Sequence, residues 1–178
     1  MAVEPRFTSD SISFAEAIAV TQALLDNLEQ GNAEALEATV HELVRSENGA
    51  RGFFVTYLSD DRPLADHPTP AIMAALQTSP AIVAPLLIKN LAMSTAMAIT
   101  HRRNQDENLV QGSERVRSRT TQLIQALQLP QVQAEAQSLL GAIATKMGDY
   151  QAFLERWGYD LEQQQAIQQT LAALGFTQ

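Results

Sequence analysis

Arginine residues gather in one short segment of this 178-residue chain. Residues 100–119, THRRNQDENLVQGSERVRSR, hold five of the twelve Lys and Arg residues of a molecule whose formal charge is −8. A guanidinium presents planar pairs of N–H donors, which suit bidentate binding of carboxylates and phosphates. The segment therefore predicts a site for an anion or for an acidic surface of a partner protein. Its candidate residues are Arg102, Arg103, Arg115, Arg119 and His101.

An intramolecular role for the same arginines is the alternative. Residues 101–103 end an apolar helix, where cations complement the negative pole of the helix dipole. Arg102 and Asp106, and likewise Arg103 and Glu107, have ion-pair spacing if that helix continues. The sequence leaves open whether the arginines face a partner or their own chain.

The charge changes sign along the chain. It is −8 over residues 1–66, +3 over residues 67–119 and −3 over residues 120–178. An acidic molecule of this kind disfavours nonspecific binding to nucleic acids and acidic membranes. The arginine segment has no aromatic residue to stack on bases, and VQGSER lacks the glycines and the lysine of a phosphate-binding loop. We expect a protein partner and no nucleic acid.

Patterns for catalysis and for metal binding are missing from the sequence. There is no cysteine, and His41-Glu42 is not followed by the second histidine of a zinc-protease helix. The loop SDDRPLADHP at residues 59–68 offers carboxylates and His67, but its spacing matches no calcium or zinc loop. No nucleophile elbow or dinucleotide fingerprint occurs. We expect no catalytic residue, no metal and no cofactor, and we favour a non-enzymatic protein over an enzyme.

The composition predicts an all-α fold. The chain has 27 Ala, 18 Gln and abundant Leu and Glu, whereas aromatic residues and Val, which favour strands, are few. We expect a compact bundle of about seven to nine helices, with a long central helix and short C-terminal helices. Residues 1–178 are expected to form a single domain, with residues 130–178 as an optional C-terminal helical subdomain.

Capping patterns place the first helices. Ser13 and Glu16 fit a capping box, and Gly31 fits the end of that first helix. Asn32 is then expected to cap a second helix that ends near Gly49. The segment GARGFFVTYLSDDRP that follows contains strand-forming residues, but no second strand is available for pairing, so we expect a short buried helix.

The stretch from about Pro80 to Asn104 is the most apolar part of the chain. A membrane span needs about 20 such residues, but Lys89 and Asn90 lie near the middle, where a charge is costly. We therefore expect the central helix of a bundle and not a membrane span. The start of the chain lacks the basic segment and apolar run of a signal peptide. Together with the absence of cysteine, this suggests a cytoplasmic protein.

Two amphipathic helices are expected from Glu107 to Gln128 and from Pro130 onward. In the first, Val116 lies at the centre of the inward face and Gly112 lies at its edge, where a small residue allows close helix approach. Arg115 and Arg119 flank Val116 on one side and Arg117 on the other. In the second, the inward face includes Met147.

Two groups of aromatic residues are candidates for an interface or a ligand groove. They are Phe53, Phe54 and Tyr57 before the Pro-rich region, and Trp157 and Tyr159 near the C-terminus. Core packing is the alternative for both groups, and it is the more common role of such residues.

The sequence thus favours a non-catalytic regulatory or assembly protein that acts through a surface of a helical bundle. A homo-oligomer is compatible with it. The alternative is a bundle that binds an anionic or apolar small molecule, as a ligand-binding protein or an enzyme. A closed cavity touching Arg102, Arg103 or Phe54 favours the ligand, and an exposed patch of the same residues favours the partner.

Overall fold

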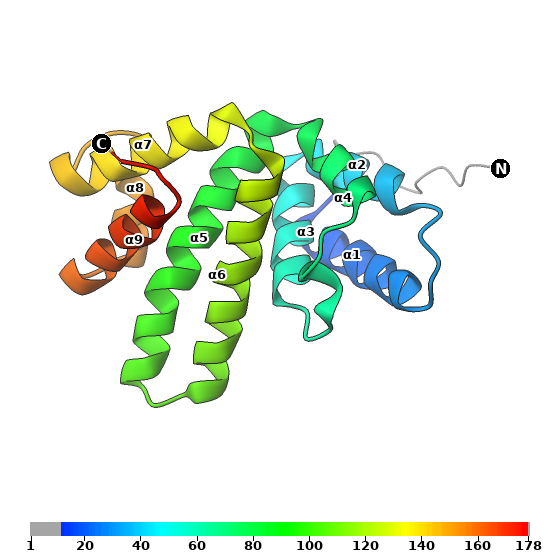
Figure 1. Ribbon diagram of the computed structural model, residues 1–178, viewed down its shortest axis with the longest axis horizontal. Helices are drawn as coiled ribbons and strands as arrows, with labels where there is room; N and C mark the ends of the chain where they lie inside the picture. The colour runs from blue at the N-terminus through cyan, green and yellow to red at the C-terminus, as the bar shows by residue number, and fades with distance from the viewer. Residues whose placement is uncertain (1–11, 178) are drawn as a thin grey trace. The chain divides into compact units, whose positions relative to one another are not determined.

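The computed structural model describes residues 12–177, and within them the chain forms nine α-helices, one 3₁₀ helix and no strand (Figure 1). The elements are α1 (Phe14–Glu29), α2 (Leu36–Val44), α3 (Glu47–Ser59), η2 (Pro63–Ala65), α4 (Pro70–Gln77), α5 (Pro80–Arg103), α6 (Glu107–Leu127), α7 (Pro130–Thr145), α8 (Gln151–Trp157) and α9 (Leu161–Ala173). The expected all-α class, the long helix and the short C-terminal helices are confirmed. The prediction that the start of the chain lacks a signal-peptide pattern concerns mainly residues 1–11, which lie outside the described residues.

The chain divides into two compact units, Met1–Leu86 and Leu87–Gln178. We call them the N-terminal unit and the C-terminal unit, and each is described by itself. The boundary falls inside α5, between Leu86 and Leu87 and one residue beyond Pro85, which has no N–H to donate within the helix. It lies well before residue 130, where the sequence suggested an optional subdomain.

The helix ends follow the capping chemistry expected from the sequence. Ser13 and Glu16 form the predicted capping box, in which the Ser13 N–H donates to Glu16 Oε2 at 2.8 Å and the Glu16 N–H donates to Ser13 Oγ at 3.2 Å. These bonds lower the pKa of Glu16. Asp160 caps α9 in the same way and accepts from the N–H of Gln163 at 3.0 Å.

The break between α2 and α3 lies earlier than expected. Ser46, and not a residue near Gly49, marks the boundary, because its hydroxyl accepts from the Gly49 N–H at 3.1 Å and caps α3. Gly49 is therefore inside α3, where a Cβ would lie 2.1 Å from the carbonyl oxygen of Leu43. The expected cap at Asn32 was also wrong, since its side chain accepts from the Glu34 N–H at 3.3 Å, before α2 begins.

The N-terminal unit is organised by α3. It packs against α1 and α2, and α2 also packs against α4. Helices α1 and α3 approach closely at Gly52, where an added Cβ would lie 2.4 Å from the Cβ of Ala17. Gly112, where close approach was expected, has no such neighbour within 4 Å. The small residue that the packing requires is thus in α3 and not in α6.

Several large apolar side chains near helix ends are exposed, among them Met147, which was expected on an inward face. Phe14 is 38% exposed and lies under the Arg51 guanidinium, whose Cζ is 5.2 Å from the ring centroid. Leu109, Met147 and Leu161 are 50%, 67% and 71% exposed. All four stand within three residues of a helix end, so the interior 3.6-residue period does not decide their burial.

The buried hydroxyl groups of α5 bond to the backbone of their own helix. Ser94 and Thr95 are buried, and their hydroxyls donate to the carbonyls of Asn90 and Leu91, each at 2.7 Å. Among the described residues, this helix is long and apolar enough to cross a membrane, and more than half of its apolar window is buried. That burial favours the expected core helix.

We expect Gly52→Ala to lower the free energy of unfolding by about 1–3 kcal/mol, because α1 and α3 must separate to admit the new methyl group. Gly112→Ala is the matched control. It adds a methyl group where nothing lies within 4 Å, and should raise the stability by about 0.5–1 kcal/mol through better helix propensity. Urea denaturation followed by circular dichroism measures both. Equal effects of the two substitutions would contradict the close crossing at Gly52.

Candidate functional site

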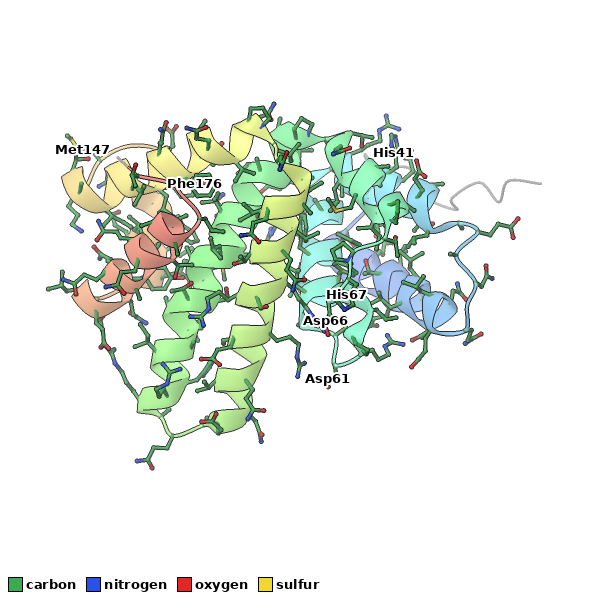
Figure 2. All side chains as sticks on the ribbon, viewed as in Figure 1. His41, Asp61, Asp66, His67, Met147 and Phe176 are labelled. Atoms are coloured by element: carbon green, nitrogen blue, oxygen red, sulfur yellow. The ribbon has the colours of Figure 1, made fainter. Side chains whose placement is uncertain are left out.

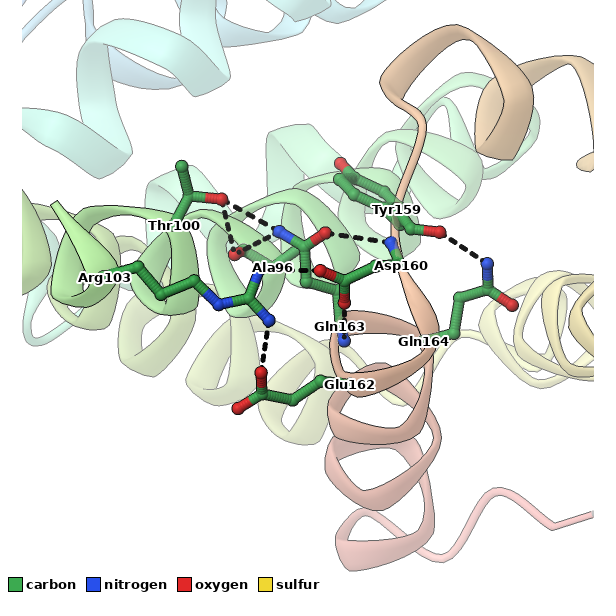
Figure 3. A network of polar contacts seen from close by, with 8 residues as sticks. All are labelled: Ala96, Thr100, Arg103, Tyr159, Asp160, Glu162, Gln163 and Gln164. Carbon is green, nitrogen blue, oxygen red and sulfur yellow. Dashed lines mark hydrogen bonds and ion pairs between the residues drawn. The ribbon is translucent and has the colours of Figure 1, made fainter.

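Helix α9 is joined to α5 by one buried glutamine. Gln163 is only 7% exposed, and its Nε2 donates to the carbonyl oxygen of Ala96 at 3.0 Å and to Oγ1 of Thr100 at 2.9 Å (Figure 3). Its Oε1 accepts from the N–H of Asp160 at 3.1 Å. Both N–H donors and the acceptor of the amide are therefore satisfied, which removes the penalty for burying it. The same side chain completes the α9 cap and fixes α9 on α5.

Arg103 adds an ion pair beside this amide. Its Nη1 donates to Asp160 Oδ2 at 2.6 Å, and its Nη2 pairs with Glu162 (Figure 3). The bonds with Asp160 and Glu162 raise the pKa of the guanidinium, and the bond from Arg103 is the main reason that the pKa of Asp160 is lowered. Arg103 thus turns toward the start of α9.

Arg102, the neighbouring residue, turns toward α6 instead. Helices α5 and α6 run side by side in opposite directions (Figure 1), and Arg102 Nη2 donates to Glu114 Oε1 at 2.9 Å. Nη2 of Arg117 lies 4.0 Å from the same carboxylate oxygen. Two guanidinium groups therefore share one carboxylate.

An open groove of about 500 Å³ lies between α5, α6 and α9 in the C-terminal unit, with Arg102 and Arg117 among the residues that line it. We call it the arginine groove. It is lined by Thr95, Ala98, Ile99, Arg102, Arg117, Glu162, Gln165, Ala166, Gln169, Thr170 and Ala173. Most of the lining side chains are small or carry an amide, and few are large and apolar. The groove therefore offers hydrogen-bonding groups, together with the cations of Arg102 and Arg117.

The other arginine-segment candidates do not line the groove. Arg119 is buried, with 2% of its surface exposed, and Arg115 is half-buried; each makes an interaction within the chain. His101 is half-buried in the last turn of α5. The ion pairs expected from Arg102 to Asp106 and from Arg103 to Glu107 are replaced by those described above. The reason is that α5 ends at Arg103 and Asp106 caps α6, accepting from the Leu109 N–H at 3.1 Å.

The aromatic candidates separate into buried and exposed residues. Phe53, Phe54 and Tyr57 of α3 are at most 1% exposed, and the rings of Phe53 and Tyr57 stack at 5.0 Å. These three residues therefore pack in the core, which was the alternative to an interface or a ligand groove. Tyr159 is also buried, and its burial raises the pKa of the phenol. Trp157 is 44% exposed at the end of α8, so it is the member of the set that a partner can reach.

His41 and the acidic loop with His67 come from separate elements of the N-terminal unit. His41 lies on α2, whereas Asp66 and His67 follow η2 (Figure 2). Asp60 of the same loop accepts two bonds of 2.8 Å from the Arg62 guanidinium. Among residues 12–177, no group of three or more His, Cys, Asp and Glu side chains could hold a metal ion.

A second polar cluster lies inside the C-terminal unit. The Tyr150 hydroxyl donates to Glu135 Oε2 at 2.6 Å, and Lys89 Nζ stands 5.9 Å from the centroid of the Tyr150 ring. Burial, followed by the Glu135 carboxylate, raises the pKa of this phenol. Lys89, the charge that argued against a membrane span, therefore packs on an aromatic face.

Three residues important to this arrangement were not among the candidate site residues predicted from the sequence. Glu114 and Arg117 lie one turn apart on α6, and that spacing was readable. Asp160-x-x-Gln163 matches a capping box, which could have indicated Gln163. Its bonds to α5 could not have been read, because Ala96 is 67 residues away in the chain.

One family model, described as uncharacterised conserved protein UCP020893, matches residues 13–174. The chain belongs to this family. The match begins at Ser13, which caps α1, and ends at Leu174, which follows α9, so the family model spans every helix of residues 12–177. No curated protein and no solved structure matches the chain. The family description names no activity, ligand or partner, so function is inferred from the geometry.

The pKa of Asp160 provides a test of the α9 junction. It lies below the ordinary value of the group, so the stabilisation from its ion pair is present above about pH 4 and is lost as the pH falls through the folded-state pKa. In Arg103→Ala the pKa should rise toward the ordinary value. ¹³C NMR titration of the carboxyl group measures it, with Arg45→Ala as the control. An unchanged pKa in Arg103→Ala would show that the pair is absent in solution.

Proposed function

We propose that this chain is a non-catalytic interaction protein that holds a segment of a partner protein in the arginine groove. The observation that carries the proposal is the exposure of two guanidinium groups at one open groove. The side chains of Arg102 and Arg117 are 58% and 38% exposed, although each faces Glu114. Arginine is enriched at protein interfaces and among the residues that dominate binding energy.

The form of the groove supports a protein segment as its occupant. Sites for small molecules usually enclose most of the ligand and are lined mainly by apolar and aromatic side chains. This groove is open, and amide, hydroxyl and guanidinium groups form much of its lining. Such a surface matches the polar, partly hydrated character of non-obligate protein interfaces.

The test is quantitative affinity purification from the native cell, with the wild-type chain and Arg102→Glu/Arg117→Glu as baits. We expect at least one partner to be recovered about tenfold less with the double variant, since loss of about 1.4 kcal/mol of binding free energy gives that ratio. Circular dichroism establishes that the variant is folded.

Arg45→Glu is the matched control. Arg45 is also an arginine on a helix surface of the chain, its side chain is 52% exposed, and it pairs with one carboxylate, Glu42, at 3.1 Å. It should retain every partner of the wild type. Equal recovery of all partners by the folded double variant would disprove the proposal.

A small anionic ligand is the second candidate, and the size of the groove favours it. About 500 Å³ lies within the range of small-molecule sites, and two cations converge there. If this candidate is right, millimolar citrate or inorganic phosphate should raise the melting temperature of the wild type and of Arg45→Glu, but not that of Arg102→Glu/Arg117→Glu. Differential scanning fluorimetry measures the shift. The same small shift in all three proteins indicates a general salt effect and removes the candidate.

A further inference from the structure

Apart from Arg117 of α6, the residues that line the arginine groove fall on two helix faces. Those from α5 are Thr95, Ala98, Ile99 and Arg102, and those from α9 are Glu162, Gln165, Ala166, Gln169, Thr170 and Ala173. Both sets recur at intervals of three and four residues, which is the period of one α-helical face. The groove is therefore the space beside two helix surfaces, into which the ridge of a further helix can pack.

Small side chains allow that helix to come close. Ala166 and Ala173 on α9 offer only methyl groups, and Thr170 is little larger, whereas Ala98 and Thr95 on α5 are buried, at 2% and 3% exposure. The hydroxyl of Thr95 is already bonded to its own helix. Gln165 and Gln169 are exposed and one turn apart, so their amides can bond to polar groups of the incoming helix.

The charges at the groove are unequally compensated. Glu162 shares Arg103 with Asp160, and it stands in the first turn of α9, where the helix dipole also stabilises a negative charge. Arg117 lies in the middle of α6, away from either helix end, and the carboxylate it faces among the described residues is Glu114, at 4.0 Å. Glu114 is held more closely by Arg102, at 2.9 Å. The Arg102 and Arg117 side therefore has two cations for one anion.

We infer that the occupant of the arginine groove is an acidic helical segment of a partner protein. The segment presents two carboxylates one helical turn apart, which bind Arg102 and Arg117. It needs small or polar side chains on the face toward α9. This inference rests on the proposed function and names the chemistry of the partner that the same groove accepts.

A second copy of this chain fits the groove less well. The chain carries −8 overall, so two copies repel each other, and the α9 residues that line the groove include no large apolar side chain to form the centre of a dimer interface. The net charge of −8 also repels an acidic partner. Its carboxylates, however, bind at the side of the groove with Arg102 and Arg117, where cations outnumber anions. The ion pairs formed there are partly exposed, so binding should weaken as salt concentration rises.

The test uses a displayed library of helical peptides with randomised surface positions, selected for binding to the full-length wild-type chain. We expect the enriched helices to carry Asp or Glu at i,i+3 or i,i+4 spacing. A synthetic copy of an enriched helix should bind the wild type and Arg45→Glu equally. It should bind the charge-reversed Arg102→Glu/Arg117→Glu and the neutral Arg102→Gln/Arg117→Gln about tenfold or more weakly, which corresponds to 1.4 kcal/mol or more.

Charge exchange gives the decisive readout. When the two acids of the peptide are replaced by Lys, it should bind Arg102→Glu/Arg117→Glu better than it binds the wild type, because the pairing is restored with opposite signs. Isothermal titration calorimetry at two salt concentrations measures these affinities. A general loss of folding in the variant cannot produce this gain.

The remaining outcomes separate the inference from the proposed function. Neutral or basic helices that are enriched and that lose binding in the groove variants would overturn the acidic occupant but leave the groove as an interaction site. Enriched helices that are insensitive to both groove variants, or no enriched helix at all, would count against both. Self-association of the wild type that is abolished in Arg102→Glu/Arg117→Glu would assign the groove to a second copy and overturn the inference.

Discussion

The attachment of α9 to α5 is the interaction on which the candidate site depends, because the groove exists only while both helix faces stay in place. Gln163 provides the specific part of that attachment. A buried amide with each of its donors and its acceptor bonded tolerates little displacement, since every shift leaves a polar group unpaired. The same amide completes the N-terminal cap of α9, so one side chain fixes both the start of the helix and its position on α5.

Apolar burial and ion pairing have different parts in holding α9 within the C-terminal unit. Ile167 and Leu171 are 1% exposed, and burying each contributes roughly 1.5–3 kcal/mol. The pairs of Arg103 with Asp160 and Glu162 are exposed at the surface, where such pairs add little to stability. Their main effect is on the orientation of side chains. They turn Arg103 toward α9, so that of the two neighbouring arginines it is Arg102 that faces the groove.

The sequence predicted features whose causes are local and missed those whose causes are distant. The capping box at Ser13 and the limits of α5 follow from neighbouring residues, and both were predicted closely. The position of Gly49 inside α3 was missed because only two residues separate α2 from α3. The residues expected to end α2 therefore form the first turn of α3. Arg102 was recognised as a candidate because it is an arginine, but the orientation of its side chain depends on Glu114 of the next helix, α6. The pairing of Arg103 with Asp160 spans 57 residues, which no local pattern records.

The position of the single tryptophan makes the two units separable by spectroscopy. Trp157 is the one tryptophan of the chain, it belongs to the C-terminal unit, and it is 44% exposed with the Arg156 guanidinium 5.9 Å from its ring centroid. Its emission therefore reports on the surroundings of α8 alone, whereas far-ultraviolet ellipticity sums every helix. Melting curves recorded by the two signals will coincide if the units lose structure together and will separate if each unit has its own cooperativity.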